Sequence, residues 1–243
     1  MKRVLVIGES CRDLFVYCES LRLAPDLPVP ILQPRKTKEN PGMAMNVYRN
    51  IISIHSNCEY FTNENWQSVT KTRYVHERSN HLFLRVDEND RIARIKIDSI
   101  NLNVDCVVIS DYNKGFLLQD DIEYICERND CVFLDTKKPL GKWASKAKFI
   151  KINNFEYGRT EGKIAKELDE KIICTLGGEG ARHKNIIYPV ECKDVRDTSG
   201  AGDSFMAALV VKYMETESIS EGINFANQKA SEIVSKRGVG VIS

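Results

Sequence analysis

The run Asp197-Thr198-Ser199-Gly200-Ala201-Gly202-Asp203 joins small residues and an acid to the start of an apolar, helix-like segment. Small residues let a backbone approach a ligand closely, and free N–H groups at a helix start bind anions. If Gly200 to Asp203 form a first turn, their amides would stabilise charge on a transferring phosphoryl group, and Asp203 would accept the proton of the attacking hydroxyl. The run therefore indicates a phosphoryl-transfer site, although an acidic N-cap with small packing residues would look similar. It is not a P-loop, because no Gly-Lys-Ser/Thr follows these glycines.

Composition and charge are those of an ordinary globular chain. Its 243 residues are 42% hydrophobic and 28% charged, which allows one large core with a small appendage. The net charge of +1 gives no reason to expect nucleic acid or an acidic membrane as a partner. The longest strongly apolar stretches are far shorter than the roughly 20 residues of a membrane span. With no signal-peptide pattern at the N-terminus, we expect a soluble chain that is not exported.

The cysteines and histidines indicate neither a disulfide framework nor a metal cage. The eight cysteines form no Cys-x-x-Cys pair, and several stand inside apolar runs, where cysteine acts as a small hydrophobe. We therefore expect reduced thiols in a cytoplasm. The four histidines lack zinc-ligand spacing, so no protein metal cage is expected.

Five short apolar runs alternate with helix-like stretches, a pattern typical of a doubly wound α/β architecture with a mainly parallel sheet. The runs are 4–7, 104–109, 131–134, 149–152 and 172–176. In such sheets ligands bind outside the carboxyl ends of the strands. The residues found there are polar, namely 9–13, Ser110, Asp111, Asp135, Asn153 and Thr175. We expect them to converge on one cleft.

Two stretches break this rhythm and predict a small β-sheet appended to the main domain. Residues 14–35 contain four prolines, and residues 71–87 are rich in β-formers with a turn signal at 77–80. Such a sheet could be a lid that excludes water, a dimer surface, or both, and a hairpin without function stays open as the alternative. We expect residues 1–243 to form one domain with these lid segments inserted.

The run at 197–205 resembles the second signature of the PfkB (ribokinase-like) carbohydrate kinases. That resemblance implies Asp203 as the general base, an anion hole of Gly200, Ala201 and Gly202, and ATP as the phosphoryl donor. Three further segments resemble the branch that phosphorylates D-glycero-D-manno-heptose 7-phosphate. They are Arg22–Pro30, Lys71–Val75 followed by Leu82–Asp87, and Ser110–Gly115. The resemblance spans nearly the whole chain and implies phosphorylation of the anomeric hydroxyl to the 1,7-bisphosphate.

The resemblance also implies residues for the cofactors. Asn153 and Glu156 form an Asn-x-x-Glu pattern in which the acid organises Mg2+ through water, which suits a metal that gives up its water reluctantly. Contacts to ATP are implied for Thr175, Gly177, Gly180 and Asn227. A monovalent cation such as K+ is implied at Asp197 with the Arg237-Gly238 region. From the residues alone, a solvated helix-turn acid, a glycine-rich hairpin turn and a core-packed helix remain alternatives.

For the acceptor, the resemblance implies Asp13, Gly42, Asn46 and Asp111 as sugar contacts. A distal phosphate would bind cations, for which the candidates are Lys71, Arg73, Arg85 and Lys114, the two arginines first because guanidinium forks phosphate oxygens. A solvated lid surface is the competing explanation of these charges. As partners we expect a small sugar phosphate and a second copy of the chain in a homodimer through the lid.

Two departures from the family pattern bear on the substrate. Met43 stands where the family has the second glycine of Gly-Gly-x-x-x-Asn, and only sixteen residues separate Ile54 from Lys71 in place of an α/β unit. We therefore expect a sheet trimmed by one such unit. The chain ends where the kinase domain ends, so we expect no nucleotidyltransferase half. A kinase for another sugar, for example fructokinase-like, and a non-catalytic sugar-phosphate or nucleotide binder are the alternatives.

Overall fold

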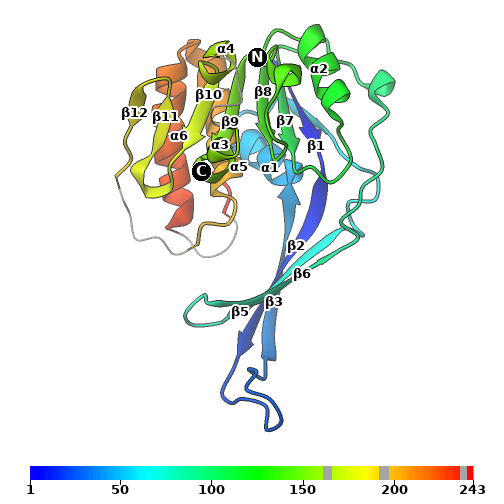
Figure 1. The fold of residues 1–243 in the computed structure, drawn as a ribbon, viewed down its shortest axis with the longest axis vertical. Helices are drawn as coiled ribbons and strands as arrows, with labels where there is room; N and C mark the ends of the chain where they lie inside the picture. The colour runs from blue at the N-terminus through cyan, green and yellow to red at the C-terminus, as the bar shows by residue number, and fades with distance from the viewer. Residues whose placement is uncertain (161–165, 192–196, 236–239, 243) are drawn as a thin grey trace.

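Parallel strands form the centre of the main sheet. The computed structural model describes residues 1–160, 166–191, 197–235 and 240–242, and within them the sheet has eight strands in the order β12-β11-β10-β9-β8-β7-β1-β4 (Figure 1). Strands β1, β4, β7, β8, β9 and β10 run parallel to one another. At one edge β11 is antiparallel to β10, and β12 is antiparallel to β11. The bounds are β1 (Val4–Gly8), β4 (Cys58–Phe61), β7 (Cys106–Asp111), β8 (Val132–Thr136), β9 (Phe149–Asn153), β10 (Ile172–Thr175), β11 (Ala181–His183) and β12 (Ile186–Tyr188).

Helices cover both faces of this sheet, which confirms the predicted doubly wound architecture. One face packs on α1 (Ala44–Ile54), α5 (Ala201–Thr216) and α6 (Ile219–Val234). The other packs on α2 (Gln119–Arg128), η2 (Lys142–Ala144) and α4 (Lys166–Asp169). Burial on both faces explains why the central strands are continuous apolar runs and do not alternate. The remaining short helices are η1 (Ile97–Ser99), α3 (Asn154–Gly158) and η3 (Gly177–Glu179).

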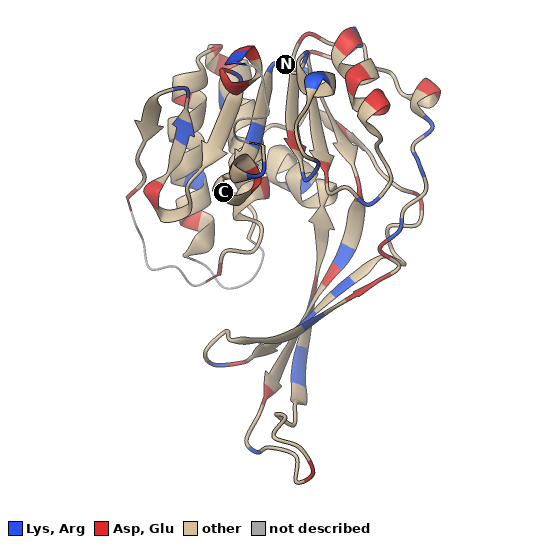
Figure 2. Cartoon of the chain, in the orientation of Figure 1, with Lys and Arg blue, Asp and Glu red and all other residues tan. Residues whose placement is uncertain are grey.

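A second sheet with the order β3-β2-β5-β6 projects from the main domain (Figure 1). Its strands are β2 (Ser10–Glu19), β3 (Gln33–Met43), β5 (Thr70–His76) and β6 (Leu82–Glu88), and we call it the lid. Strands β5 and β6 form the predicted hairpin, with the turn between His76 and Leu82. Figure 2 shows charged residues of both signs along the lid strands.

The lid is more extensive than the sequence predicted. Strand β2 starts at Ser10, almost directly after β1, and β3 continues to Met43, where α1 begins. Three prolines of the first lid segment lie between β2 and β3, and Pro34 pairs with Cys18 where the register shifts. Proline has no N–H to donate to a strand ladder, so the prolines indicate where the strands are irregular or end. They do not predict how long the regular strands beside them are.

Residues 55–69, all described, add edge strand β4 to the main sheet and contain no helix. This agrees with the predicted shortening at that point.

No helix in the described part of the chain is long and apolar enough to cross a membrane. The cysteines of the described residues are all free thiols, and Cys192 lies outside them.

Candidate active site

The first turn of α5 separates two cavities. A cavity of about 370 Å³, which we call the acceptor cavity, lies between this turn and the lid and is lined by Ser199, Gly200 and Asp203. A second one of about 210 Å³, the nucleotide cavity, lies on the other side and is lined by Thr198, Ala201 and Gly202. The helix start thus presents an acid to one cavity and small residues to the other.

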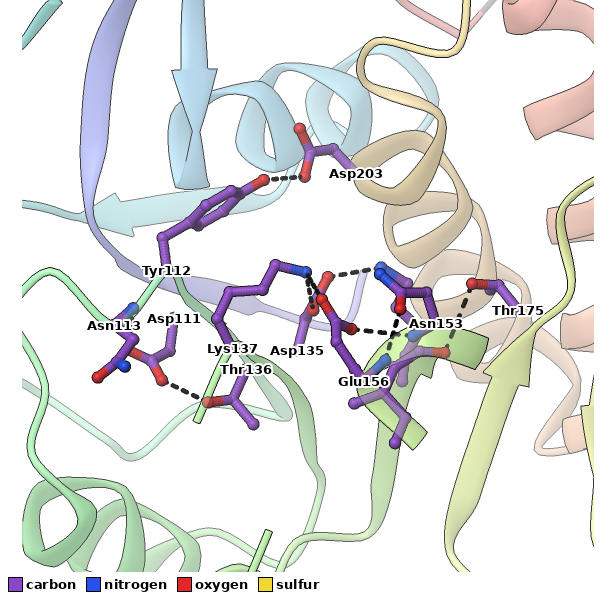
Figure 3. A network of polar contacts seen from close by, with 12 residues as sticks. Asp111, Tyr112, Asn113, Asp135, Thr136, Lys137, Asn153, Glu156, Thr175 and Asp203 are labelled. Atoms are coloured by element: carbon purple, nitrogen blue, oxygen red, sulfur yellow. Dashed lines mark hydrogen bonds and ion pairs between the residues drawn. The ribbon is translucent and has the colours of Figure 1, made fainter. Parts of the chain in front are cut away.

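Asp203 is buried at the beginning of α5, and both of its carboxylate oxygens accept hydrogen bonds, of which Figure 3 shows the one from Tyr112. The Tyr112 hydroxyl donates to Oδ1 at 2.8 Å, and the Asn46 amide donates to Oδ2 at 2.8 Å. Burial raises the pKa of Asp203 above its ordinary value, while the bonds from Asn46 and Tyr112 and the charge of Lys151 oppose the rise. The result is an oriented carboxylate with enhanced basicity, which suits a general base.

Gly200 allows the sharp entry into α5. It is the N-cap and has a φ of 80°, a left-handed conformation that glycine adopts without strain. Gly202, in the first turn, sits over a buried lysine, because a Cβ there would lie 2.9 Å from Lys151 Nζ. Both glycines therefore have a local structural reason to be glycine.

Glu9 positions the loop that carries Tyr112. Its buried carboxylate accepts bonds from the backbone N–H of Tyr112 at 2.8 Å and of Lys114 at 2.9 Å. Burial and the nearby charge of Asp111 raise the pKa of Glu9. Sequence reasoning assigned no role to Glu9 or Tyr112, although Glu9 directly follows the first strand and Tyr112 belongs to a quoted motif.

The acceptor cavity contains most of the predicted substrate residues. Asp13, Gly42 and Asn46 line it, together with five cationic side chains: Lys71, Arg73, Arg85, Lys114 and Lys137. Arg73 pairs with Asp13, Lys114 with Asp90, and Arg85 with both oxygens of Asp87 at 2.6 Å.

Lys71 differs from the other cations of this cavity. Within the described residues no carboxylate lies at ion-pair distance from its ammonium. The ammonium contacts Met43 Sδ at 3.2 Å and lies over the Tyr112 ring, 5.1 Å from the ring centroid. Burial lowers the pKa of Lys71. A buried ammonium with spare donors is a ready partner for an anion.

Asp111 is buried and does not line the acceptor cavity. Its carboxylate accepts bonds from Lys138 Nζ at 2.6 Å, from the backbone N–H of Asn113 at 3.1 Å and from the Thr136 hydroxyl. These bonds join the ends of β7 and β8 and hold the following loop. A direct sugar contact by Asp111 stays a prediction.

The nucleotide cavity brings together Thr175, Gly177, Gly180 and Asn227, with apolar walls from Val190, Phe205, Ala230 and Val234. Gly180 has a φ of 96°, and a Cβ there would lie 2.1 Å from the Tyr188 carbonyl oxygen. The Asn227 amide donates to that same carbonyl at 2.8 Å, which fixes α6 against β12. An apolar slot beside glycine backbone suits a flat base and its phosphates.

A charge network, buried at Asp135 and Lys151 and partly exposed at Lys137 and Glu156, lies beside the start of α5 (Figure 3). Asp135 accepts from Lys151 at 2.7 Å, and Lys137 bridges Asp135 at 3.6 Å and Glu156 at 2.6 Å. Burial opposes ionisation of Asp135, but the charges of Lys151 and Lys137 outweigh it and lower its pKa. Lys137 was missed by the sequence analysis, although it stands two residues beyond the strand-end acid Asp135.

Asn153 and Glu156 hold each other at the start of α3. Asn153 Oδ1 accepts from the Glu156 N–H at 2.8 Å, and Glu156 Oε2 accepts from the Asn153 N–H at 2.9 Å. This is a capping box, which explains the Asn-x-x-Glu spacing locally and keeps the Glu156 carboxylate beside Lys137.

The predicted monovalent-cation site is only partly described. Asp197 Oδ1 accepts from the Ser199 N–H at 2.9 Å, and Arg237 and Gly238 lie outside the described residues. Among the residues that are described, no group of three or more His, Cys, Asp and Glu side chains could hold a metal ion.

Comparison with known proteins assigns the family. The profile of the pfkB family carbohydrate kinases matches residues 101–243. The chain belongs to the pfkB family. The resemblance of the Asp197–Phe205 run is thereby confirmed at family level, and the family is one of carbohydrate kinases.

Curated relatives extend over the whole PfkB chain. The bifunctional protein HldE of Nitratiruptor sp. is 28% identical over 97% of this chain and 62% of its own length. That of Helicobacter pylori is 27% identical over 100% of this chain and 65% of its own length. The chain thus spans less than two thirds of these relatives. The alignments are 288 and 301 positions long, so the relatives carry residues that this 243-residue chain lacks.

Solved structures confirm the ribokinase-like fold. Ribokinase from Thermotoga maritima superposes with a TM-score of 0.76 at 17% identity, covering 98% of this chain and 95% of its own. Phosphofructokinase-2 from Escherichia coli, in a complex with potassium, superposes with a TM-score of 0.71 at 15% identity, covering 100% and 96%.

Proposed function

We propose that this PfkB domain transfers the γ-phosphoryl group of ATP to the anomeric hydroxyl of D-glycero-D-manno-heptose 7-phosphate. The observation that carries the proposal is the placement of the α5 start between two cavities, one with Asp203 and five cations and one with glycine backbone and apolar walls. Similarity to bifunctional HldE proteins across the chain supports a heptose phosphate as the acceptor.

The chemistry follows from this arrangement. The acceptor oxygen bonds to the γ-phosphorus, the bond from that phosphorus to the β–γ bridging oxygen breaks, and ADP leaves. Asp203 accepts the hydroxyl proton, while Asn46 and Tyr112 keep its carboxylate oriented toward the acceptor. The amides of Gly200, Ala201 and Gly202 stabilise the charge on the transferring group.

The residues present fit ATP and Mg2+. Asp135 Oδ1 is buried and accepts no hydrogen bond from the described residues. Lys137 forms ion pairs with both Asp135 and Glu156, which keeps the two carboxylates near each other. Mg2+ in kinases takes most of its ligands from phosphates and water, which suits a site without an all-protein cage. Bound there through water by Glu156 and Asp135, the ion would neutralise phosphate charge. For K+ we propose the loop of Asp197.

The cations of the acceptor cavity are proposed to bind the distal phosphate. Lys71 has no carboxylate partner in the described part of the chain, so it can receive the phosphate without breaking an ion pair. Arg73, Arg85 and Lys114 complete the site, and Asp13, Gly42 and Asn46 remain for sugar hydroxyls.

We further propose that residues 1–243 act as one kinase domain that pairs with a second copy through the lid. Edge strand β6 exposes three apolar side chains, Leu82, Leu84 and Val86. The segment between β2 and β3 exposes Leu21, Leu23, Leu27 and Val29. An open strand edge with apolar side chains is a template for pairing with another chain.

The test is ADP release from Mg-ATP against D-glycero-D-manno-heptose 7-phosphate, sedoheptulose 7-phosphate, fructose, fructose 6-phosphate and ribose. Turnover confined to the heptose phosphate is the expected result. Turnover with fructose or another sugar would keep the kinase and overturn the substrate. ATP binding without turnover on any sugar would favour a non-catalytic binder.

A further inference from the structure

Met43 has a backbone conformation that its residue type disfavours. It is the last residue of β3 and the N-cap of α1, with a φ of 62° and a ψ of −133°. Glycine adopts this region freely, whereas a Cβ is crowded there. The side chain is buried and lines the acceptor cavity. Strain of this kind concentrates at functional sites. The presence of a methionine at a position that favours glycine therefore needs an explanation.

The turn at Met43 does not need a side chain. The next two amides are fixed by neighbouring elements: the Ala44 N–H donates to the Glu9 carbonyl at 2.9 Å, and the Met45 N–H donates to Ser10 Oγ at 3.1 Å. These bonds oblige the chain to turn from the lid strand into α1 at this position. A glycine would make the same turn without strain.

The Met43 thioether touches the cation that has no carboxylate partner in the described residues. Its Sδ lies 3.2 Å from Lys71 Nζ. The same ammonium lies over the Tyr112 ring, 5.1 Å from its centroid, and the Tyr112 hydroxyl donates to Asp203 at 2.8 Å. Met43, Lys71, Tyr112 and Asp203 therefore follow one another along the acceptor cavity.

We propose that Met43 is a specificity-determining residue, whose thioether limits the length of the phosphorylated acceptor that fits between Lys71 and Asp203. The inference rests on the proposed function, because it takes the phosphate to bind at Lys71 and the reacting hydroxyl to lie at Asp203. One methylene more or less in a packed site changes selectivity by roughly 10- to 200-fold. Removing the side chain at the Lys71 end would make room for a longer acceptor.

The test compares binding of fructose 6-phosphate and D-glycero-D-manno-heptose 7-phosphate by titration calorimetry. In Met43→Gly the ratio of the two dissociation constants should move at least roughly tenfold toward the seven-carbon acceptor. Met43→Leu keeps the bulk and should keep the ratio. Met43→Ala opens the same space and retains a Cβ, so it answers the question if the glycine variant does not fold.

Lys184→Gly is the matched control for the backbone. Lys184 is exposed in the β11–β12 turn and also has a positive φ, 55°. Its replacement puts glycine at another positive-φ position, away from the acceptor cavity, and should leave the ratio of the two dissociation constants unchanged.

The outcomes distinguish failure of the proposed role of Met43 from failure of the proposed substrate. Equal selectivity in all variants, with the heptose phosphate bound, would overturn the role of Met43 alone. Binding of a sugar phosphate to Met43→Gly or Met43→Ala but not to the unsubstituted chain would support that role and overturn the proposed substrate. Binding of neither compound to any protein would overturn both.

Discussion

Asp203, the proposed general base, illustrates how its surroundings change the properties of one carboxylate. Burial raises its pKa, and two donors, Asn46 and Tyr112, occupy one oxygen each. The opposing effects leave a base that is oriented and more basic than an exposed aspartate. The donors come from α1 and from the loop after β7, so the site depends on three separate segments.

Replacing Asp203 with Asn should lower turnover by roughly 100- to 10,000-fold, because the proton acceptor is lost. ATP affinity should stay the same, since Asp203 lines the acceptor cavity and not the nucleotide cavity. Steady-state kinetics and calorimetry with ATP measure the two quantities. Glu215→Gln, an exposed change on the same helix, is the control and should alter neither. Full turnover in D203N would exclude Asp203 as the base.

The Tyr112 hydroxyl bond lowers the pKa of Asp203, so Tyr112→Phe should raise it. Because the base must be deprotonated, kcat/KM falls as the pH drops through this pKa, and the acidic limb of the profile should move to higher pH in Y112F. A pH–rate series measures the shift. Tyr124→Phe, a change on α2, should leave the limb in place. A limb that moves to lower pH in Y112F would contradict the assignment.

The elements hold the site through their ends. The start of α5 divides the cavities, the start of α1 carries Asn46, and the glycine turn after β10 forms one wall of the nucleotide cavity. Helix starts and strand ends leave backbone groups unpaired, which makes them natural places for a ligand.

Gly180→Ala should destabilise the turn between β10 and β11. The added Cβ would meet the Tyr188 carbonyl oxygen at 2.1 Å in a left-handed conformation. We expect a loss of about 1–3 kcal/mol, seen as a lower melting temperature. ATP, if it binds this wall, should also bind more weakly. Gly158→Ala in α3 is the matched control, because its Cβ would meet nothing within 4 Å, and it should melt no earlier than the unsubstituted chain.

At the scale of the whole molecule, the lid carries three of the five cations that line the acceptor cavity and also the exposed apolar edge. Lys71 and Arg73 lie on β5 and Arg85 on β6, while Leu82, Leu84 and Val86 of β6 are exposed. A second copy that covered this edge would lie close to the acceptor cavity. Pairing and acceptor binding are therefore expected to influence each other.

Leu84→Glu should weaken pairing through the lid, because it places a charge on the apolar edge. Leu84 is 44% exposed, so the change should not disturb the core. Light scattering after size exclusion should show a mass near the dimer for the unsubstituted chain and near the monomer for L84E. Leu118→Glu, at a site 41% exposed outside the lid, should keep the dimer mass. A monomeric unsubstituted chain would refute lid pairing.

Much of the fold was readable from local pattern. Buried parallel strands appear as apolar runs, and β1, β7, β8, β9 and β10 lie where such runs were found. The nine-residue signature at 197–205 predicted a helix start with an acid, and the fold presents this start between two cavities. These features depend on neighbours in sequence, whose periodicity and turn chemistry are visible in the chain.

Contacts between distant segments had no such local signal. The bonds of Asn46 and Tyr112 to Asp203 span 157 and 91 residues. Whether the Lys71 ammonium pairs with a carboxylate depends on where the fold places the acids around it, and in the described residues it contacts Met43 Sδ. Asp111, at a strand end like Asp135, bonds to Lys138 and Thr136 and does not line the acceptor cavity. Which of several polar groups at one sheet edge faces a cavity is decided by packing, because burial makes each find a partner.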